Sequence, residues 1–128
     1  INILDNQSVL EQQINIIGLS DNQKTNDKIK YFESLYNANY YNLLLVHQPS
    51  IWKSVREKAN LTLSGHTHNG QIFPFNFIVM LQFPEIYGVY SYLENKLYVS
   101  SGGATWGPKI RIGSKNEILK IQLSPTHD

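Results

Sequence analysis

The sequence predicts an α/β fold built on a parallel sheet, and three features of its 128 residues carry this prediction. Residues 42–47 and residues 61–65 are continuous apolar runs, which are typical of strands buried on both faces. Pro49 and Ser50 can open a helix that extends to about residue 59 and lies between the two runs. A strand, a helix and a second strand in this order form a βαβ unit, whose strands are parallel.

The elements before this unit are predicted from apolar stretches and helical spacing. Residues 1–4 and 9–19 are apolar and a polar Asp-Asn-Gln sequence separates them, which indicates two short strands and favours a hairpin. Residues 20–27 form a polar loop that ends in residues able to cap a helix. Ile29, Phe32 and Leu35 then follow at helical spacing, so we expect an amphipathic helix over residues 27–37.

The elements after the βαβ unit are shorter and more irregular. Residues 87–93 and 97–101 are predicted to be two strands joined by a turn at residues 94–96. A glycine-rich loop over residues 101–109 follows, and the alternation of residues 117–123 predicts a last strand. We place no domain boundary within residues 1–128 and expect residues 124–128 to be a frayed tail.

The apolar stretch of residues 72–87 has two interpretations. It contains two prolines and no clear period. Such a stretch is most often part of the core or a short helix packed on the sheet. The alternative is an apolar flap near the functional site, which would suit a lipid-linked substrate or contact with a membrane surface.

The composition excludes several classes of protein. The formal net charge of +1 gives no signal for binding to nucleic acid. The absence of cysteine excludes disulfides and thiolate metal sites, so any metal is bound through nitrogen and oxygen. No apolar run approaches the ~18 residues of a membrane-spanning helix. The chain opens on Ile1 without a signal-peptide pattern, and we expect Ile1 to be an internal position of a longer protein.

Three of the four histidines fall at the ends of the two predicted parallel strands. His47 ends the first strand, and His66 and His68 follow the second. Ligand sites of parallel sheets lie beyond the carboxyl ends of the strands, so we expect these side chains to converge at one sheet edge. Imidazole is a common metal ligand, and such groups can bind one ion or two ions ~3.5–4 Å apart. The pattern therefore predicts a metal site at His47, His66 and His68.

Other interpretations of the same residues stay open at this point. His66 and His68 could lie on an ordinary surface loop, although glycines on either side suit a backbone held close to a ligand. A lone histidine that ends a buried strand is more often a hydrogen-bonded packing residue than a ligand. His127 lies in the predicted tail and carries no functional weight. Among the carboxylates Asp21 is the best candidate ligand, although a turn or cap role is more common for such a residue.

Four segments together resemble the calcineurin-like metallophosphoesterases, in particular a bacterial branch with a GHTH element and a C-terminal GTWGP-like signature. They read LLLVHQP (residues 43–49), SGHTHNGQ (residues 64–71), INIIGLSD (residues 14–21) and GGATWGPKIRIGSKNEI (residues 102–118). The resemblance covers residues 1–123. It implies a two-sheet α/β sandwich with helices outside, of which this chain would be the C-terminal half.

The resemblance also implies an activity and its cofactors. The activity would be metal-dependent hydrolysis of a phosphoester, of the phosphodiesterase or pyrophosphatase type, in which a metal-bound hydroxide attacks phosphorus. The cofactors would be two divalent ions, manganese, iron or zinc. His47 and His66 would bind one ion, and His68 would bind the other. The protein would be bacterial, and either cytoplasmic or associated with a membrane.

The chain departs from the family pattern in three motifs. The family has an early D-x-H, a G-D-x-x-[DE] and a G-N-H-[DE], and no Asp-x-His, Gly-Asp or Asn-His sequence occurs here. The bridging carboxylate, the asparagine ligand and the general-acid histidine are therefore expected upstream of this chain, which we predict to be inactive alone. Asn69 stands where the branch usually has glycine, and we expect only a small change in loop geometry.

Several residues are weaker candidates for contact with a substrate. The backbone of Gly102 and Gly103 could offer N–H groups to a phosphate, although a tight connection between strands explains the same glycines. The guanidinium of Arg111 could bind phosphate in a bidentate manner, although arginine is also common at strand edges. Gln71 and Trp106 are further candidates.

Two other functional classes and one structural consequence remain. The chain could be a metal- or ligand-binding module without catalysis, or a degenerate phosphoesterase scaffold that contacts a partner through its apolar stretch. If it is an enzyme, the expected partner is a phosphate ester or pyrophosphate, a lipid-linked one included, and not a nucleic acid. Half a sandwich leaves a sheet face uncovered, so we expect the isolated chain to aggregate or to form domain-swapped dimers.

Overall fold

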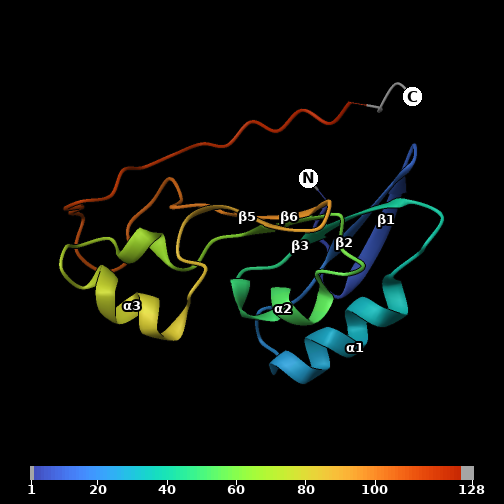
Figure 1. The fold of residues 1–128 in the computed structure, drawn as a ribbon, viewed down its shortest axis with the longest axis horizontal. Coiled ribbons are helices and arrows are strands. Elements are labelled where there is room, and N and C mark those ends of the chain that lie inside the picture. The colour runs from blue at the N-terminus through green and yellow to red at the C-terminus, as the bar shows by residue number, and fades with distance from the viewer. Residues whose placement is uncertain (1, 125–128) are drawn as a thin grey trace.

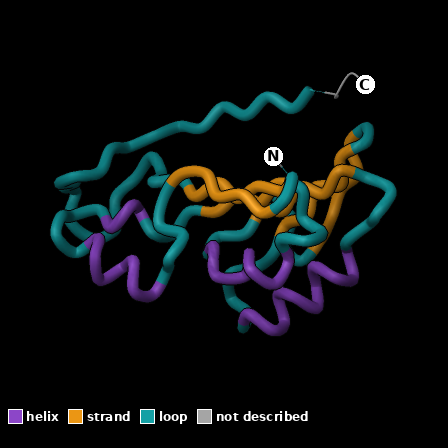
Figure 2. The backbone as a smooth tube through the Cα atoms, viewed as in Figure 1, coloured by secondary structure: helices purple, strands orange, loops and turns teal. Residues whose placement is uncertain are grey.

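The computed structural model describes residues 2–124, which form one six-stranded sheet with helices packed on it (Figures 1 and 2). The strand order is β1-β2-β3-β4-β6-β5. The strands are β1 (Gln7–Glu11), β2 (Ile14–Gly18), β3 (Tyr41–Leu45), β4 (Leu61–Ser64), β5 (Gly88–Tyr92) and β6 (Asn95–Val99). The helices are α1 (Thr25–Leu35), α2 (Trp52–Val55) and α3 (Asn76–Gln82), with the 3₁₀ turns η1 (Pro49–Ile51) and η2 (His68–Gly70).

The middle of the sheet is parallel and its edges are antiparallel. Strands β2, β3, β4 and β6 run in the same direction, with Leu43 opposite Leu61 in the β3–β4 register. Strand β1 pairs with β2, and β5 pairs with β6, as antiparallel neighbours. The predicted α/β fold and the predicted parallel pair around η1 and α2 are confirmed.

The core lies between the sheet and the two helices α1 and α2, which Figure 1 shows on the same side of the sheet. The buried apolar side chains of this cluster are Ile17, Leu19, Phe32, Leu44, Val46, Ile51, Val55 and Ala59. Burying one large apolar side chain stabilises a fold by ~1.5–3 kcal/mol. The cluster therefore fixes α1, η1 and α2 against the strands whose carboxyl ends carry the histidines.

The opposite face of the sheet is apolar and largely uncovered. Leu44 points into the core, so its neighbours Leu43 and Leu45 point to the other face. Leu45 is 36% exposed and Tyr41 is 39% exposed, while Ile16 and Leu43 are half-buried. Strands with apolar side chains on both faces are typical of a sheet that has a layer on each side. We call residues 14, 16, 41, 43, 45 and 63 the open face.

The N-terminal hairpin is confirmed, but its position differs from the prediction. Strands β1 and β2 turn at Gln12, whose φ is 54°, inside the stretch that was predicted to be one strand. Residues 2–4 are not a strand. Leu4 instead packs on Gly18, where an added Cβ would lie 2.4 Å from the Leu4 Cβ. Gln12 and Gln13 form the polar turn, which is not apparent when residues 9–19 are taken together as one apolar stretch.

Two other predicted elements are shorter or missing. The helix after Pro49 ends at Val55 instead of residue 59. The strand predicted over residues 117–123 is wrong, because this described segment has no regular secondary structure and Ile118 is 96% exposed. Alternation alone does not make a strand without a neighbour to pair with. Residues 125–128, which include His127 and most of the predicted tail, lie outside the described residues.

The apolar stretch after the histidines lies on the surface and not in the core. Helix α3 contains no buried residue, and Phe77, Ile78 and Leu81 are 57%, 62% and 87% exposed. A seven-residue helix with apolar side chains all round cannot bury them against one neighbour. The interpretation of this stretch as core is therefore wrong, apart from the buried Phe83 and Ile86. We call residues 73–82 the apolar flap.

The apolar flap is held beside the histidine loop. Helix α3 contacts η2, and Gly70 permits the close approach because an added Cβ would lie 2.3 Å from the Asn76 Cα. Gly70 also has a φ of 69°, which a glycine adopts at little cost. No helix within residues 2–124 is long and apolar enough to cross a membrane.

Candidate metal site

The candidate site lies beyond the carboxyl ends of β3 and β4. His47 follows β3 and His66 follows β4, each by two residues. The Gly65 N–H donates a hydrogen bond to the His47 carbonyl oxygen at 3.0 Å, which ties the two strand extensions together. The parallel register and this bond bring two imidazoles from neighbouring strands to one edge, as the sequence predicted.

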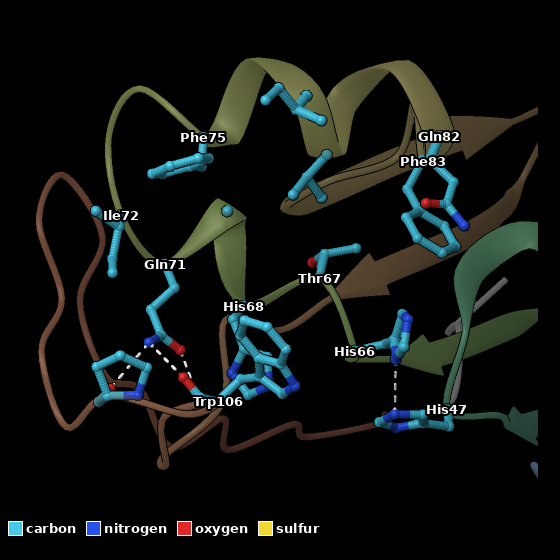
Figure 3. A pocket seen from close by; sticks show the side chains of 14 residues that line it. His47, His66, Thr67, His68, Gln71, Ile72, Phe75, Gln82, Phe83 and Trp106 are labelled. Carbon is cyan, nitrogen blue, oxygen red and sulfur yellow. Dashed lines mark hydrogen bonds between the residues drawn. The ribbon is translucent and has the colours of Figure 1, made fainter.

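His47 and His66 form a pair. The His66 Nδ1 and the His47 Nε2 are 2.9 Å apart, and the two rings meet edge to face with centroids 4.8 Å apart (Figure 3). Two nitrogens that bind one ion at ~2.1 Å are about 3 Å apart in octahedral geometry and about 3.4 Å apart in tetrahedral geometry. The observed spacing therefore fits two ligands of a single divalent ion.

The environment favours neutral imidazoles at this edge. Burial is the largest cause that lowers the pKa of His66, and repulsion from His47 adds to it, while Asp21 acts in the opposite direction. Burial and the nearby Arg111 guanidinium lower the pKa of His68. Neutral imidazole is the form that binds metal, so both shifts favour ligation.

His68 belongs to a separate part of the site. Its Nδ1 lies 3.4 Å from Arg111 Nη2, and its carbonyl oxygen accepts a hydrogen bond from Arg111 Nη1 at 3.1 Å. An added Cβ on Gly102 would lie 3.8 Å from the His68 Nδ1, so the glycine-rich loop lies against this ring. The structure thus joins His47 to His66, and His68 to Arg111 and Gly102.

The histidine loop has an unusual backbone. Four non-glycine residues have φ in the left-handed region, namely His66 (70°), His68 (49°), Asn69 (52°) and Gln71 (49°). Such conformations cost roughly 1–3 kcal/mol each and cluster at functional sites. Asn69 is among the residues that tolerate this region best, which fits its place where the resemblance has glycine.

Arg111 organises the glycine-rich loop. Its Nη2 donates to the carbonyl oxygens of Ser101 at 2.7 Å and of Gly102 at 3.4 Å, and it also bonds the Ala104 carbonyl. These bonds occupy Nη2, one of the guanidinium nitrogens that the sequence suggested for binding a phosphate. Gly103 is exposed on the same loop.

Gln71 fixes the far end of the same loop. Its Oε1 accepts a hydrogen bond from the Trp106 N–H, and its Nε2 donates to the carbonyl oxygens of Trp106 at 2.8 Å and Pro108 at 3.1 Å. Gln71 is buried, with 6% of its surface exposed. The amide that was predicted to contact a substrate is therefore engaged with the backbone.

A cavity of about 710 Å³ opens between the histidines and the apolar flap (Figure 3). Its apolar wall is formed by Phe75, Ile78, Val79 and Phe83, and Trp106 lines it from the glycine-rich loop. Phe83 meets the ring of His66 edge to face, with centroids 5.2 Å apart. The histidines thus face a pocket that is mainly apolar.

Sequence reasoning missed two polar contacts near the site. Lys28 is buried on α1 and its Nζ donates to the Asp21 Oδ1 at 2.8 Å. Although burial alone would raise the pKa of Asp21, the hydrogen bond from Lys28 and the Lys28 charge hold it below its ordinary value. Glu117 accepts hydrogen bonds from the Tyr87 and Tyr98 hydroxyls and from the Ser101 N–H beside the glycine-rich loop. In the sequence, the only sign of the contact between Lys28 and Asp21 is that Lys28 stands next to Ile29 in the predicted helix.

Residues 2–124 do not contain a complete metal centre. No group of three or more His, Asp or Glu side chains in this range is placed to hold one ion. The histidine pair and His68 are the candidate ligands that this part of the chain offers.

Curated relatives of the chain are named as metallophosphoesterases. An uncharacterized metallophosphoesterase of Helicobacter pylori strain 26695 is 36% identical over 131 residues, which cover 96% of this chain and 35% of the relative. One from Campylobacter jejuni is 44% identical over 90 residues, 68% of this chain and 24% of the relative. A transmembrane protein with metallophosphoesterase domain from Bos taurus is 45% identical over 85 residues, 63% of this chain and 19% of the relative.

These similarities identify the family to which the chain belongs. No family model and no solved structure matches it. Imidazoles gathered at the carboxyl ends of parallel strands place this chain among α/β proteins with a candidate ligand site at the sheet edge. The chain belongs to the calcineurin-like metallophosphoesterase family and covers a C-terminal portion of it. It spans 24% and 35% of the length of its Campylobacter and Helicobacter relatives, and relatives occur in animals as well as bacteria.

Proposed function

We propose that this chain is the C-terminal part of a single metallophosphoesterase domain and that the complete domain hydrolyses a phosphodiester or a pyrophosphate. Two observations support the partial domain. The open face leaves Tyr41 and Leu45 exposed, whereas the core is packed on the other face of the same strands. Residues 2–124 also lack a group of three ligands for one ion. A second layer from the same domain would cover the open face, and further ligands from it would complete the metal site.

The observation that carries the metal site is the histidine pair. His47 and His66 hold ring nitrogens 2.9 Å apart, which fits one divalent ion, and His68 would bind a second ion on the side of the glycine-rich loop. Two ions, manganese, iron or zinc, would supply Lewis-acid activation of water and neutralise the phosphoryl oxygens. The left-handed backbone of this loop fixes the imidazole directions before a ligand binds.

The remaining site residues would shape the pocket. Arg111 and Gln71 hold the glycine-rich loop from opposite ends, so that Gly102 and Gly103 stand beside His68 as candidate contacts for a phosphate. The general acid would come from the part of the domain outside this chain, and we propose that the chain alone is inactive.

The cavity suggests an apolar group on the substrate. Phe75, Ile78, Val79 and Phe83 would exclude water from one side of the metals and would bind a hydrocarbon or aromatic substituent of a phosphoester. A lipid-linked phosphoester has such a substituent. We therefore propose this class, and we propose that the apolar flap contacts the membrane surface in which the substrate resides.

The charges near the flap agree with a membrane surface. Residues 66–84 contain no acidic side chain, and exposed Lys109 and Lys115 lie on the neighbouring segment, where residues 101–116 also contain no acid. Lysines beside exposed aromatic and aliphatic side chains favour anionic lipid headgroups. The protein would then work at the cytoplasmic face of a membrane.

Manganese-dependent hydrolysis of a chromogenic phosphodiester by the full-length protein tests the proposal. We expect turnover by the full-length protein, none by the 128-residue chain, and loss of turnover in full-length His66→Ala. His127→Ala is the matched control and should retain activity. Turnover by His66→Ala, or metal-dependent turnover by the isolated chain, would contradict the assignment of the site.

A binding module without catalysis is the second candidate. The absence of a three-ligand group within residues 2–124 and the engagement of Arg111 with backbone carbonyls favour it. If the full-length protein binds manganese in calorimetry but hydrolyses neither phosphodiesters nor pyrophosphates, this second function replaces the first.

A further inference from the structure

The segment after the last strand is fastened to the site by one carboxylate. Glu117 Oε1 accepts hydrogen bonds from the Ser101 N–H at 3.0 Å and the Tyr98 hydroxyl at 3.1 Å. Its Oε2 accepts hydrogen bonds from the Tyr87 hydroxyl at 3.0 Å and from the Tyr98 hydroxyl, which both oxygens share, at 3.1 Å. The Glu117 N–H also donates to the Gly102 carbonyl oxygen at 3.1 Å. A single side chain thus joins β6, the residue before β5 and the start of the glycine-rich loop.

Glu117 is held in its charged form. Burial alone would raise its pKa, but hydrogen bonds from Ser100, Ser101, Tyr87 and Tyr98 outweigh this and lower the pKa below the ordinary value. Hydrogen bonds to a charged acceptor are roughly twice as strong as neutral ones. The carboxylate therefore anchors the loop more firmly than an amide of the same shape would.

The loop that Glu117 anchors is the loop that holds His68. The carbonyl oxygens of Ser101 and Gly102 accept hydrogen bonds from Arg111 Nη2. The same guanidinium lies 3.4 Å from the His68 Nδ1 and donates a hydrogen bond to the His68 carbonyl oxygen. Gly102 also lies against the imidazole, with a φ of 77° that keeps its backbone close. The direction of the His68 ring thus depends on where the Ser101–Gly102 backbone is fixed.

We propose that Glu117 is a positioning residue for His68, acting through Ser101, Gly102 and Arg111. The idea that this positioning serves a metal site rests on the proposed function, whereas the positioning of the His68 ring itself needs no metal. The effect is selective, because no hydrogen bond within residues 2–124 joins His47 or His66 to this network. Changing Glu117 should disturb His68 and leave the histidine pair in place.

Nuclear magnetic resonance of the histidine rings in the full-length, metal-free protein tests the proposal. Glu117→Gln keeps the shape and removes the charge, and we expect shifted His68 ring ¹⁵N and ¹H signals with unchanged His47 and His66 signals. Glu94→Gln is the matched control, because Glu94 is exposed at the β5–β6 turn, and it should shift none of the three. Unchanged His68 signals in folded Glu117→Gln would overturn the proposal.

A second variant keeps the test decisive if Glu117→Gln does not fold. Tyr98→Phe removes one donor to the carboxylate and leaves the backbone bonds, so it should shift the His68 signals in the same direction by a smaller amount. No shift in this variant would also overturn the proposal.

Manganese binding then separates this proposal from the proposed function. We expect Glu117→Gln to weaken manganese binding about tenfold, which is the lower end of what removing support from a ligand usually costs. A protein whose His68 signals shift but which binds no manganese would retain the positioning role and contradict the metal site alone. Equal manganese affinity together with shifted His68 signals would show that the positioning does not serve the metal, and would overturn that part of the inference.

Discussion

At the scale of single residues, hydrogen-bond partners decide which side chains hold the loop and which face the cavity. Arg111 Nη2 and Gln71 Nε2 donate to backbone carbonyl oxygens. His47 and His66 bond each other, and no other side chain within residues 2–124 bonds their rings. The imidazoles are therefore the groups that remain for a ligand, while the polar residues around them set the backbone.

The pKa of Tyr98 predicts a loss of stability at alkaline pH. Burial, followed by the hydrogen bond to Glu117, raises this pKa from 10.0 to about 12. A folded-state pKa above the unfolded value contributes stability below about pH 10, and this contribution is lost as pH rises towards about 12. We expect the unfolding free energy, measured in urea, to fall across this range.

Tyr98→Phe isolates this contribution from the other groups that titrate at high pH. The variant should be less stable than the wild type near neutral pH, because it lacks the hydroxyl that donates to Glu117. The difference should shrink as pH rises towards about 12. A difference that stays constant over this range would show that Tyr98 is not the group responsible.

At the same scale, the sequence could predict that His47 and His66 meet, but not the contacts of Glu117. Two buried runs and the rule for parallel sheets suffice to bring His47 and His66 to one edge. The partners of Glu117 lie 16 to 30 positions away in the chain, and their meeting depends on the path of an irregular loop. No local pattern encodes such a contact.

At the scale of secondary-structure elements, a row of asparagines joins the strands at the edge opposite the histidines. Asn15 Nδ2 donates to Asn42 Oδ1 at 2.9 Å, and the Asn42 N–H donates to Asn60 Oδ1 at 2.7 Å. Asn60 Nδ2 continues to Asn95 Oδ1 at 3.3 Å. These four residues link β2, β3, the start of β4 and β6.

Removal of the central asparagine should cost much of the fold's stability. Asn42 is 1% exposed, and its side chain also donates to the carbonyl oxygens of Asn37 and Tyr40. Asn42→Ala would remove these bonds and also the acceptor of the buried Asn15 amide, at about 1–3 kcal/mol for each buried group left unsatisfied. We expect a loss of roughly 3 kcal/mol in urea unfolding of the full-length protein.

The control for this prediction is Asn39→Ala. Asn39 is exposed, and only its backbone N–H takes part in a hydrogen bond, so the change should stay within about 0.5 kcal/mol. Equal stabilities of the two variants would mean that the asparagine row does not hold the strands together.

The apolar flap shows why hydrophobicity alone did not give its position. Its composition is that of a core segment, yet α3 is too short and too apolar on all sides to be buried by η2. The strand predicted over residues 117–123 failed for a related reason, since its alternation has no pairing edge. The long elements with a packed face, such as α1 and β3, were predicted within about two residues.

Exposed residues of the flap should matter for binding to a membrane and not for folding. Phe77→Ser with Leu81→Ser should reduce cosedimentation of the full-length protein with anionic phospholipid vesicles at least several-fold. The unfolding free energy should change by less than about 0.5 kcal/mol, because both side chains are exposed. Leu93→Ser, at another exposed apolar position, should leave vesicle binding unchanged. Equal vesicle binding by the flap variant would contradict the membrane contact.

At the scale of the whole molecule, the two faces of the sheet are unequal. On one face, α1, η1 and α2 pack on the central strands. Figure 1 shows the C-terminal segment on the other side of the sheet from these helices. That segment leaves Leu119 and Ile121 about 40% exposed, so it does not seal the open face. The α/β class could be predicted from the residues, and an uncovered sheet face was expected from the resemblance to half of a two-sheet sandwich.

The unequal faces predict that the 128-residue chain alone self-associates. Its open face presents Tyr41 and Leu45 to water, and a second copy is the simplest apolar cover. Sedimentation velocity should show dimers or larger species that grow with concentration. Leu45→Glu should reduce them, whereas Tyr31→Glu, at an exposed tyrosine on α1, should not.

The same substitution should act in the opposite direction in the full-length protein. If a second layer of the domain covers the open face, Leu45→Glu buries a carboxylate there and should lower the unfolding free energy by roughly 2–4 kcal/mol. Leu45→Glu would then reduce the self-association of the isolated chain and destabilise the complete domain. A monomeric 128-residue chain with a cooperative melt, together with a full-length Leu45→Glu of unchanged stability, would mean that no second layer covers this face.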